Sequence, residues 1–189
     1  AEPSLPDSVF VEDTVLLFDE LAVLTRPGAE SRRFEVASIE AAFKLYRKVI
    51  TRIEEPGTMD GGDVLRIGKR VFVGLSARSN QAAIDQLQAI VAEYGYTVTA
   101  VRTHECLHLK SAVTEIAPDT ILVNPAWVDP AVFGDVQVVA VDPDEPYAAN
   151  GLLIRAAAPA SDGQCDGPAE AGPHDRVDRA PASSVTIYP

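Results

Sequence analysis

The sequence Asp63-Val-Leu-Arg-Ile-Gly-Lys-Arg-Val-Phe-Val-Gly-Leu75 gives the clearest indication of the fold. Two runs rich in β-branched and aromatic residues flank the polar turn Gly68-Lys-Arg70, a pattern that predicts a β-hairpin. A helical stretch follows, with a cap expected at Ser79 or Asn80. Its apolar face is formed by Ile84, Leu87, Ile90 and Val91. A third strand is expected over residues 96–101, so the order of elements is strand, strand, helix, strand.

The same order occurs once before this unit. Two short strand-like runs surround the polar turn Asp19-Glu20, and a third strand is expected over residues 49–53. The helix between the second and third strands is expected to bury one face. The side chains assigned to that face are Phe34, Ile39, Ala42, Phe43 and Tyr46.

A weaker copy follows the middle unit. Strands are expected over residues 111–116, 120–123 and 136–141, with a short helical segment over residues 130–133. Residues 150–154 are expected to open a fourth copy as a strand. Units of this kind cannot bury their own faces, so they must pack side by side around a shared axis or stack. The sequence therefore predicts an α/β (α+β) fold built from ββαβ modules.

Composition excludes several classes of protein. The 189 residues hold 16 Lys and Arg against 28 Asp and Glu, a net charge of −12, which opposes both a phosphate backbone and an anionic bilayer. We therefore expect no nucleic-acid partner and no membrane partner. The two cysteines, Cys106 and Cys165, fit a reducing compartment better than a disulfide scaffold, so a cytoplasmic location is expected.

The chain divides into two regions by composition. Residues 1–154 carry the repeated units and are expected to form the domain. Residues 155–189 are rich in Ala, Pro and Gly and hold few large apolar side chains, so they are expected to form a disordered or aberrant tail, such as a shifted reading frame would produce.

The repeat also makes a functional prediction. If rotation relates the units, the residues just ahead of each first strand converge on one mouth. These residues are Glu12 and Asp13, then residues 60–63, then His108, then Asn150. Carboxylates accept paired N–H donors, so an acidic cluster beside an imidazole suits a cation such as a guanidinium. The alternative is that these acidic residues are solvated turn residues or caps.

Five motifs carry a family resemblance. They are Phe10-Val-Glu-Asp13, Thr25-Arg-Pro-Gly-Ala29 with Ser31-Arg-Arg33, Asp60-Gly-Gly-Asp-Val-Leu65, Phe72-Val-Gly-Leu-Ser76 with Arg78 and Asn80, and Leu107-His-Leu-Lys-Ser-Ala112. In this order they resemble the dimethylarginine dimethylaminohydrolases of the guanidine-modifying, or pentein, superfamily, which also holds arginine deiminases and amidinotransferases. The similarity runs from about residue 7 to about residue 154.

The resemblance implies a fold and a reaction. The family fold is an α/β propeller of five ββαβ modules around a central active site, of which about three are expected here as a partial pentein. In the family, a cysteine attacks the guanidinium carbon of a methylated arginine, and a methylamine leaves. Water then hydrolyses the thiouronium intermediate to give citrulline. The implied partner is a small guanidino substrate, and no cofactor and no metal are implied.

Residue roles follow from the matched motifs only. The catalytic residues would be His108, as general acid and base, and Asp60, which would orient it. The resemblance assigns Glu12 and Asp13 to the substrate guanidinium and Asp7 to its amino group. The remaining two substrate-binding residues, which would hold the substrate carboxylate, are Arg32 and Arg78.

The sequence departs from the family at both ends. The family's cysteine lies in a Thr-Cys-Cys-Ser-like segment that this sequence lacks, so no nucleophile is identified and Cys106 is expected to pack as a small apolar group. The family's N-terminal module is also expected to be missing, and the open edges that this leaves predict self-association through exposed strands. Three readings stay open: an enzyme of this family whose chain is inactive, a non-catalytic binding module for arginine-like cations, and a fragment of an arginine deiminase or amidinotransferase.

Overall fold

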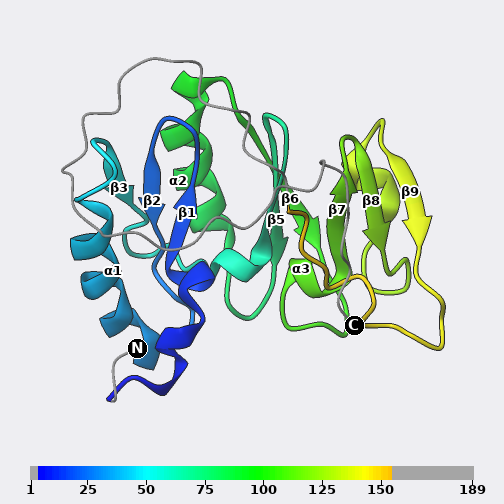
Figure 1. Ribbon diagram of the computed structural model, residues 1–189, viewed down its shortest axis with the longest axis horizontal. Helices are drawn as coiled ribbons and strands as arrows, with labels where there is room; N and C mark the ends of the chain where they lie inside the picture. The colour runs from blue at the N-terminus through cyan, green and yellow to red at the C-terminus, as the bar shows by residue number, and fades with distance from the viewer. Residues whose placement is uncertain (1–3, 155–189) are drawn as a thin grey trace, which may run out of the picture.

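Three small sheets follow one another along the computed structural model, which describes residues 4–154 (Figure 1). The first holds β1 (Val15–Leu17), β2 (Ala22–Leu24) and β3 (Ile50–Arg52). The second holds β4 (Val64–Ile67), β5 (Arg70–Leu75) and β6 (Thr97–Arg102). The third holds β7 (Val113–Ala117), β8 (Thr120–Val123) and β9 (Gln137–Ala140).

Helices connect and flank these strands. The α-helices are α1 (Val36–Phe43), α2 (Gln81–Val91) and α3 (Leu109–Ala112). The 3₁₀ segments are η1 (Pro6–Val9), η2 (Val11–Thr14), η3 (Glu30–Glu35), η4 (Gly61–Asp63), η5 (Ala92–Tyr94) and η6 (Pro130–Phe133). Within the described residues, no helix is both long enough and apolar enough to cross a membrane.

Each sheet has the connectivity expected of a ββαβ module. In the middle sheet β4 and β5 form an antiparallel hairpin, in which Val64 lies opposite Val73, and β6 then pairs with β5 in parallel. The first and third sheets repeat this pattern of one antiparallel and one parallel pair. The mixed α/β fold and its repeated units are therefore as predicted, with the modules side by side in chain order (Figure 1).

The middle module has the strongest apolar core. Helix α2 begins at Asn80, whose side-chain oxygen accepts a hydrogen bond from the Ala83 N–H, so the predicted cap is Asn80. Leu87 is fully buried, and Ile90 packs on the same core while remaining partly exposed. Ile84 and Val91 are buried beside Leu87, which confirms the predicted face.

The face predicted for the first helix is partly wrong. Ile39 and Phe43 pack against the core of the first sheet, but the side chains of Phe34 and Tyr46 are 74% and 79% exposed. Phe34 lies in the 3₁₀ segment η3, and Tyr46 lies beyond the end of α1. A 3₁₀ turn has 3.0 residues rather than 3.6, so an apolar face predicted with the α-helical spacing does not continue into the 3₁₀ segment. Ala42 is also exposed.

The predicted strand over residues 150–154 is absent from the described residues, which show no regular structure there. Instead, the Gly151 N–H donates to the Thr114 hydroxyl oxygen at 3.2 Å. An extended segment becomes a strand only when its backbone pairs with another strand. Within residues 4–154 this segment is bonded to a side chain of β7 and forms no backbone pairing with that strand. The predicted tail, residues 155–189, lies outside the described residues, as does Cys165.

Candidate active site

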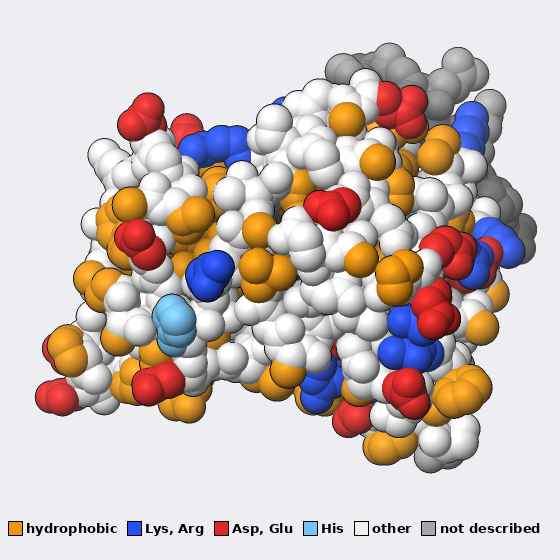
Figure 2. Space-filling model, turned by 180° about the vertical axis from the view of Figure 1, so that it is seen from behind, with side chains coloured by type: hydrophobic (Ala, Val, Ile, Leu, Met, Phe, Trp, Pro, Cys, Tyr) orange, Lys and Arg blue, Asp and Glu red, His pale blue; other side chains and the backbone are white. Residues whose placement is uncertain are grey.

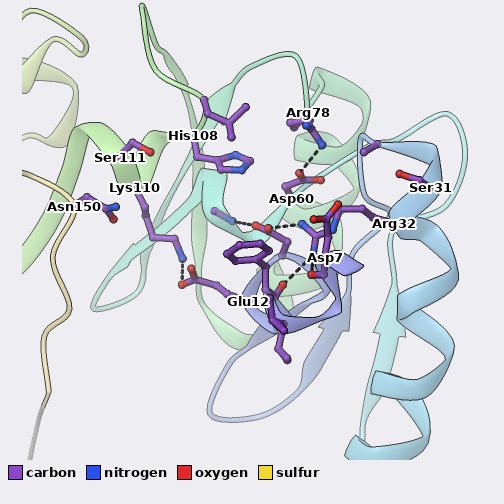
Figure 3. A pocket seen from close by; sticks show the side chains of 17 residues that line it. Asp7, Glu12, Ser31, Arg32, Asp60, Arg78, His108, Lys110, Ser111 and Asn150 are labelled. Atoms are coloured by element: carbon purple, nitrogen blue, oxygen red, sulfur yellow. Dashed lines mark hydrogen bonds and ion pairs between the residues drawn. The ribbon is translucent and has the colours of Figure 1, made fainter. Parts of the chain in front are cut away.

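A cavity of about 700 Å³ lies where the three modules meet (Figure 3). Its size is within the range usual for small-molecule sites. All seven side chains assigned to the site from sequence line it: Asp7, Glu12, Asp13, Arg32, Asp60, Arg78 and His108. Asn150 lines it as well. The residues predicted to converge ahead of each first strand therefore do meet here, except that Gly61 and Asp63 do not line the cavity.

Two glycines make this convergence sterically feasible. A Cβ atom on Gly61 would lie 2.0 Å from the carbonyl oxygen of Glu12, so only glycine lets the first and middle modules approach this closely. A Cβ atom on Gly62 would lie 2.9 Å from two ring carbons of His108. The glycine pair between the two carboxylates, Asp60 and Asp63, thus makes room for a backbone on one side and an imidazole on the other.

Asp60 is a fully buried carboxylate at the base of the cavity. Its Oδ1 accepts a hydrogen bond from the Gly28 N–H at 2.8 Å. Its Oδ2 has no hydrogen-bond partner among the described residues and lies 3.7 Å from the Arg78 guanidinium. Burial raises the pKa of Asp60 above its usual value, although the Gly28 N–H opposes this. One buried acceptor oxygen of Asp60 is therefore without a hydrogen bond among the described residues.

His108 lies beside three carboxylates. Burial alone would lower its pKa, but contact with Asp63 and the charges of Asp13 and Asp60 outweigh burial, so the pKa of His108 lies above its usual value. Nδ1 lies 3.5 Å from Asp63 Oδ2, which is an ionic contact rather than a well-formed hydrogen bond. The sequence analysis assigned the orienting role to Asp60. The carboxylate that contacts Nδ1 is Asp63, the last residue of η4.

Asp13 and Arg32, both assigned to the substrate, pair with each other. Asp13 Oδ2 accepts from Arg32 at 2.6 Å, and Oδ1 accepts from the Gly62 N–H at 2.9 Å. Arg32 also pairs with buried Glu35 at 2.8 Å and donates to the carbonyl oxygen of Phe10. A buried guanidinium needs such partners. In this structure Arg32 therefore binds groups of its own module, and its assignment to a substrate carboxylate stays a prediction.

The other assigned residues lie at the cavity wall and rim. Glu12 is exposed and pairs with Lys110, whose ammonium group the sequence analysis left without a role (Figure 3). Lys110 stands two residues after His108 in the Leu-His-Leu-Lys-Ser motif, which is the signal that could have identified it. The Arg78 side chain is 32% exposed and lines the cavity, as does Asp7.

The described part of the cavity wall carries no thiol. Cys106 lies in the loop before His108, half-buried against the apolar cluster around Leu109 and Phe133. Burial raises the pKa of the Cys106 thiol, which disfavours the thiolate needed for attack. The structure thus agrees with the prediction that Cys106 packs as a small apolar group.

The cavity also contains a set of groups that could coordinate a cation. Asp13, Asp60 and His108 offer ligand atoms within 4.8 Å of one another. The guanidinium groups of Arg32 and Arg78 already lie against two of these carboxylates, at 2.6 Å and 3.7 Å. The arrangement favours recognition of planar nitrogen donors, which can share carboxylate oxygens with such neighbours.

Repeated ββαβ modules surround a polar cavity with buried carboxylates and a histidine, an arrangement whose chemistry suits a small cationic ligand. The family model described as arginine deiminase matches residues 3–156. The N(G),N(G)-dimethylarginine dimethylaminohydrolase of Streptomyces coelicolor is 46% identical over 129 residues, which are 68% of this chain and 50% of that protein. The Pseudomonas aeruginosa protein of the same name is 38% identical over 150 residues, 79% of this chain and 59% of that protein.

Solved structures agree with these matches. The P. aeruginosa enzyme, in a mutant form complexed with citrulline, has a TM-score of 0.76 and 37% identity, over 81% of this chain and 60% of that one. The N-terminal domain of a cyanobacterial arginine dihydrolase has a TM-score of 0.71 at 18% identity over 81% of this chain and 60% of that one, a likeness of fold alone. The chain therefore belongs to the arginine deiminase family, in its dimethylarginine dimethylaminohydrolase branch, as the motifs predict. It spans 50% and 59% of the length of the two relatives.

Proposed function

We propose that this chain supplies the guanidino-binding and proton-transfer half of a dimethylarginine dimethylaminohydrolase site. The observation that carries the proposal is the meeting of Asp60, Asp13 and His108 from three modules in one cavity, beside an open buried acceptor oxygen. Relatives at 38–46% identity carry the name of that activity, and one was solved with citrulline bound. The proposed ligand is therefore a methylated arginine.

The geometry suits the bond changes of this reaction. A thiolate adds to the guanidinium carbon, the C–N bond to the methylamine breaks, and the departing nitrogen takes a proton. His108, whose pKa is raised by its carboxylate neighbours, is suited to hold that proton and then to accept one from the attacking water. Addition of that water and loss of the thiolate leave the ureido group of citrulline.

Substrate contacts follow from which side chains remain accessible. Arg78 is proposed to bind the substrate carboxylate and Asp7 its amino group, since both face the cavity. Asp60 Oδ2 and the Asp13 carboxylate are proposed to accept from the guanidinium. Glu12 can join them only by exchanging its ion pair with Lys110, so its contribution to affinity is expected to be smaller.

We further propose that this chain binds its ligand without turnover. The reaction needs a thiolate, and the described cavity wall offers none. This observation favours a second candidate function, a binding module for arginine-like cations. A cytoplasmic location remains part of the proposal and rests on the low cysteine content.

Calorimetry with asymmetric dimethylarginine, together with a citrulline-release assay, tests the proposal. We expect heat of binding from the full chain and no citrulline above background. Asp60→Asn should remove most of the heat, because it removes a buried acceptor. The matched control is Asp19→Asn, an exposed carboxylate outside the cavity. Absence of binding in the full chain would contradict the proposal, and citrulline release would contradict the claim of no turnover.

Self-association through strand edges is a further part of the proposal. All four residues of the edge strand β9 are exposed, including Val138 and Val139 at 48% and 44%. On the face shown in Figure 2, apolar side chains are scattered among charged ones. The edge strand β9 is therefore a better surface than this face for contact with a second copy of the chain. Val138→Lys combined with Val139→Lys should shift the chain toward the monomer in sedimentation velocity, and an unchanged distribution would reject β9 as the contact.

A further inference from the structure

Asp63 is a buried carboxylate to which the family resemblance assigns no role. Its exposure is 0%, and its oxygens accept from the Ser76 hydroxyl at 2.6 Å, the Ser79 hydroxyl at 2.7 Å and the Leu109 N–H at 3.0 Å. A buried charge is costly unless it is compensated in this way. These three hydrogen bonds fix the position of the Asp63 carboxylate.

The same contacts tie Asp63 to His108. Oδ2, which accepts both hydroxyl hydrogen bonds, is also the atom 3.5 Å from His108 Nδ1. Oδ1 accepts from the backbone N–H of Leu109, the residue next to His108 in the chain. One carboxylate therefore lies against the ring and hydrogen-bonds the backbone that carries it. A Cβ atom on Gly74 would lie 2.9 Å from Oδ1, so the carboxylate fills space that only a glycine leaves open.

Asp60 differs from Asp63 although both are fully buried near the same imidazole. Asp60 has one oxygen without a hydrogen bond, facing Arg78 and the cavity (Figure 3). Asp63 has hydrogen bonds on both oxygens and does not line the cavity. The open carboxylate is available to a ligand, and the saturated one is available only to hold its neighbours.

We propose that Asp63 is the positioning residue for His108: it holds a proton on Nδ1 and thereby presents Nε2 to the cavity. Asp63 acts through His108 and does not touch the substrate. The role rests on the proposed function, because it makes His108 the proton-transfer group. The carboxylates that face His108 are Asp13, Asp60 and Asp63, and contact with Asp63 is the strongest of the influences that raise the pKa of His108.

The test is the tautomer of His108, measured without any ligand. Nitrogen-15 spectra of the full chain are recorded where the imidazole is neutral, and His108→Gln identifies the signal. We expect the Nδ1–H form to predominate in the unmodified chain, although a free imidazole side chain favours Nε2–H. In Asp63→Asn the amide can donate to Nδ1, so the Nε2–H form should become the major one, as such a change does in other carboxylate–histidine pairs. The pKa of His108 should fall in the same variant.

Asp60→Asn is the matched control, since it removes a neighbouring buried carboxylate by the same chemical change. It should lower the pKa of His108 but leave the Nδ1–H form predominant. A folded Asp63→Asn chain that keeps this form would overturn the proposal. Should Asp63→Asn not fold, the unmodified chain decides, because a predominant Nε2–H form there rejects the role of Asp63. Failure of ligand binding would count against the proposed function and would leave this result unaffected.

Discussion

The middle and first modules share one topology but are stabilised differently. In the middle module β5 and β6 pair over six residues, and α2 buries four side chains behind a side-chain cap. In the first module the strands are three residues long, and α1 has no fully buried residue and no side-chain cap. Its most buried polar contacts are instead the ion pairs of Arg32 with Asp13 and Glu35.

This difference shows how one site can draw on two kinds of stability. The middle module supplies Asp60, Asp63 and Arg78 from an apolar scaffold. The first supplies its cavity residues from 3₁₀ segments held by the Arg32 guanidinium. We therefore expect changes of charge to damage the first module most, and changes of apolar volume to damage the middle one most.

The largest effect is expected from Arg32→Met. It leaves the buried carboxylates of Asp13 and Glu35 without their cation, and breaking a buried pair from one side costs about 3–5 kcal/mol. Urea unfolding at neutral pH measures this cost. Arg33→Met is the control, because its partner Glu30 is exposed and such pairs contribute less than about 1 kcal/mol. Equal losses in the free energy of unfolding of the two variants would contradict the conclusion that buried ion pairs stabilise the first module.

Leu87→Ala tests the apolar scaffold of the middle module. Leu87 is fully buried in α2, so its truncation is expected to cost about 2–5 kcal/mol in the free energy of unfolding. Ile39→Ala is the corresponding change in α1, and its cost should stay below about 2 kcal/mol because Ile39 is only partly buried. The comparison fails if α1 proves the more sensitive helix in the same urea titration.

Asn80→Ala should give a smaller loss, of about 1–2 kcal/mol. It removes the side-chain acceptor at the start of α2, which also accepts from the Thr58 N–H. Thermal unfolding monitored by circular dichroism measures the loss. Gln81→Ala, the next position and an exposed one, should stay within about 0.5 kcal/mol. A cap without effect would mean that tertiary packing alone sets the start of this helix.

The pH dependence of stability should be the smallest effect. The folded-state pKa of His108 lies above the unfolded value of about 6.5, so its stabilising contribution is full below that pH and is lost as the pH rises through the folded pKa. Amide protection factors in β4 and β5, which correct for the base catalysis of intrinsic exchange, should therefore fall over that range. His108→Gln should remove this component. A stability that rises with pH through this range in the unmodified chain, but not in the variant, would reverse the sign assigned here.

Local sequence patterns were sufficient to predict much of the fold and most of the residues that line the site. The polar turns, the strand runs and the face of α2 depend on nearby residues, and the structure confirms them. The predictions over Phe34, Tyr46 and residues 150–154 were wrong, because a change of helix type and a missing strand partner are not local properties. The motifs identified which side chains meet in the cavity but not which contact which.

The repeated ββαβ order, the acidic character of the site and the family to which the chain belongs could all be predicted from the sequence, since they depend on residue type and spacing along the chain. The pairing of Asp13 with Arg32, and the contact of His108 with Asp63 rather than Asp60, became visible only in the folded chain. The partners in these two pairs lie 19 and 45 residues apart in the sequence. Which carboxylate meets which nitrogen therefore depends on burial and on the close approach of the modules, at Gly61 and Gly62 above all.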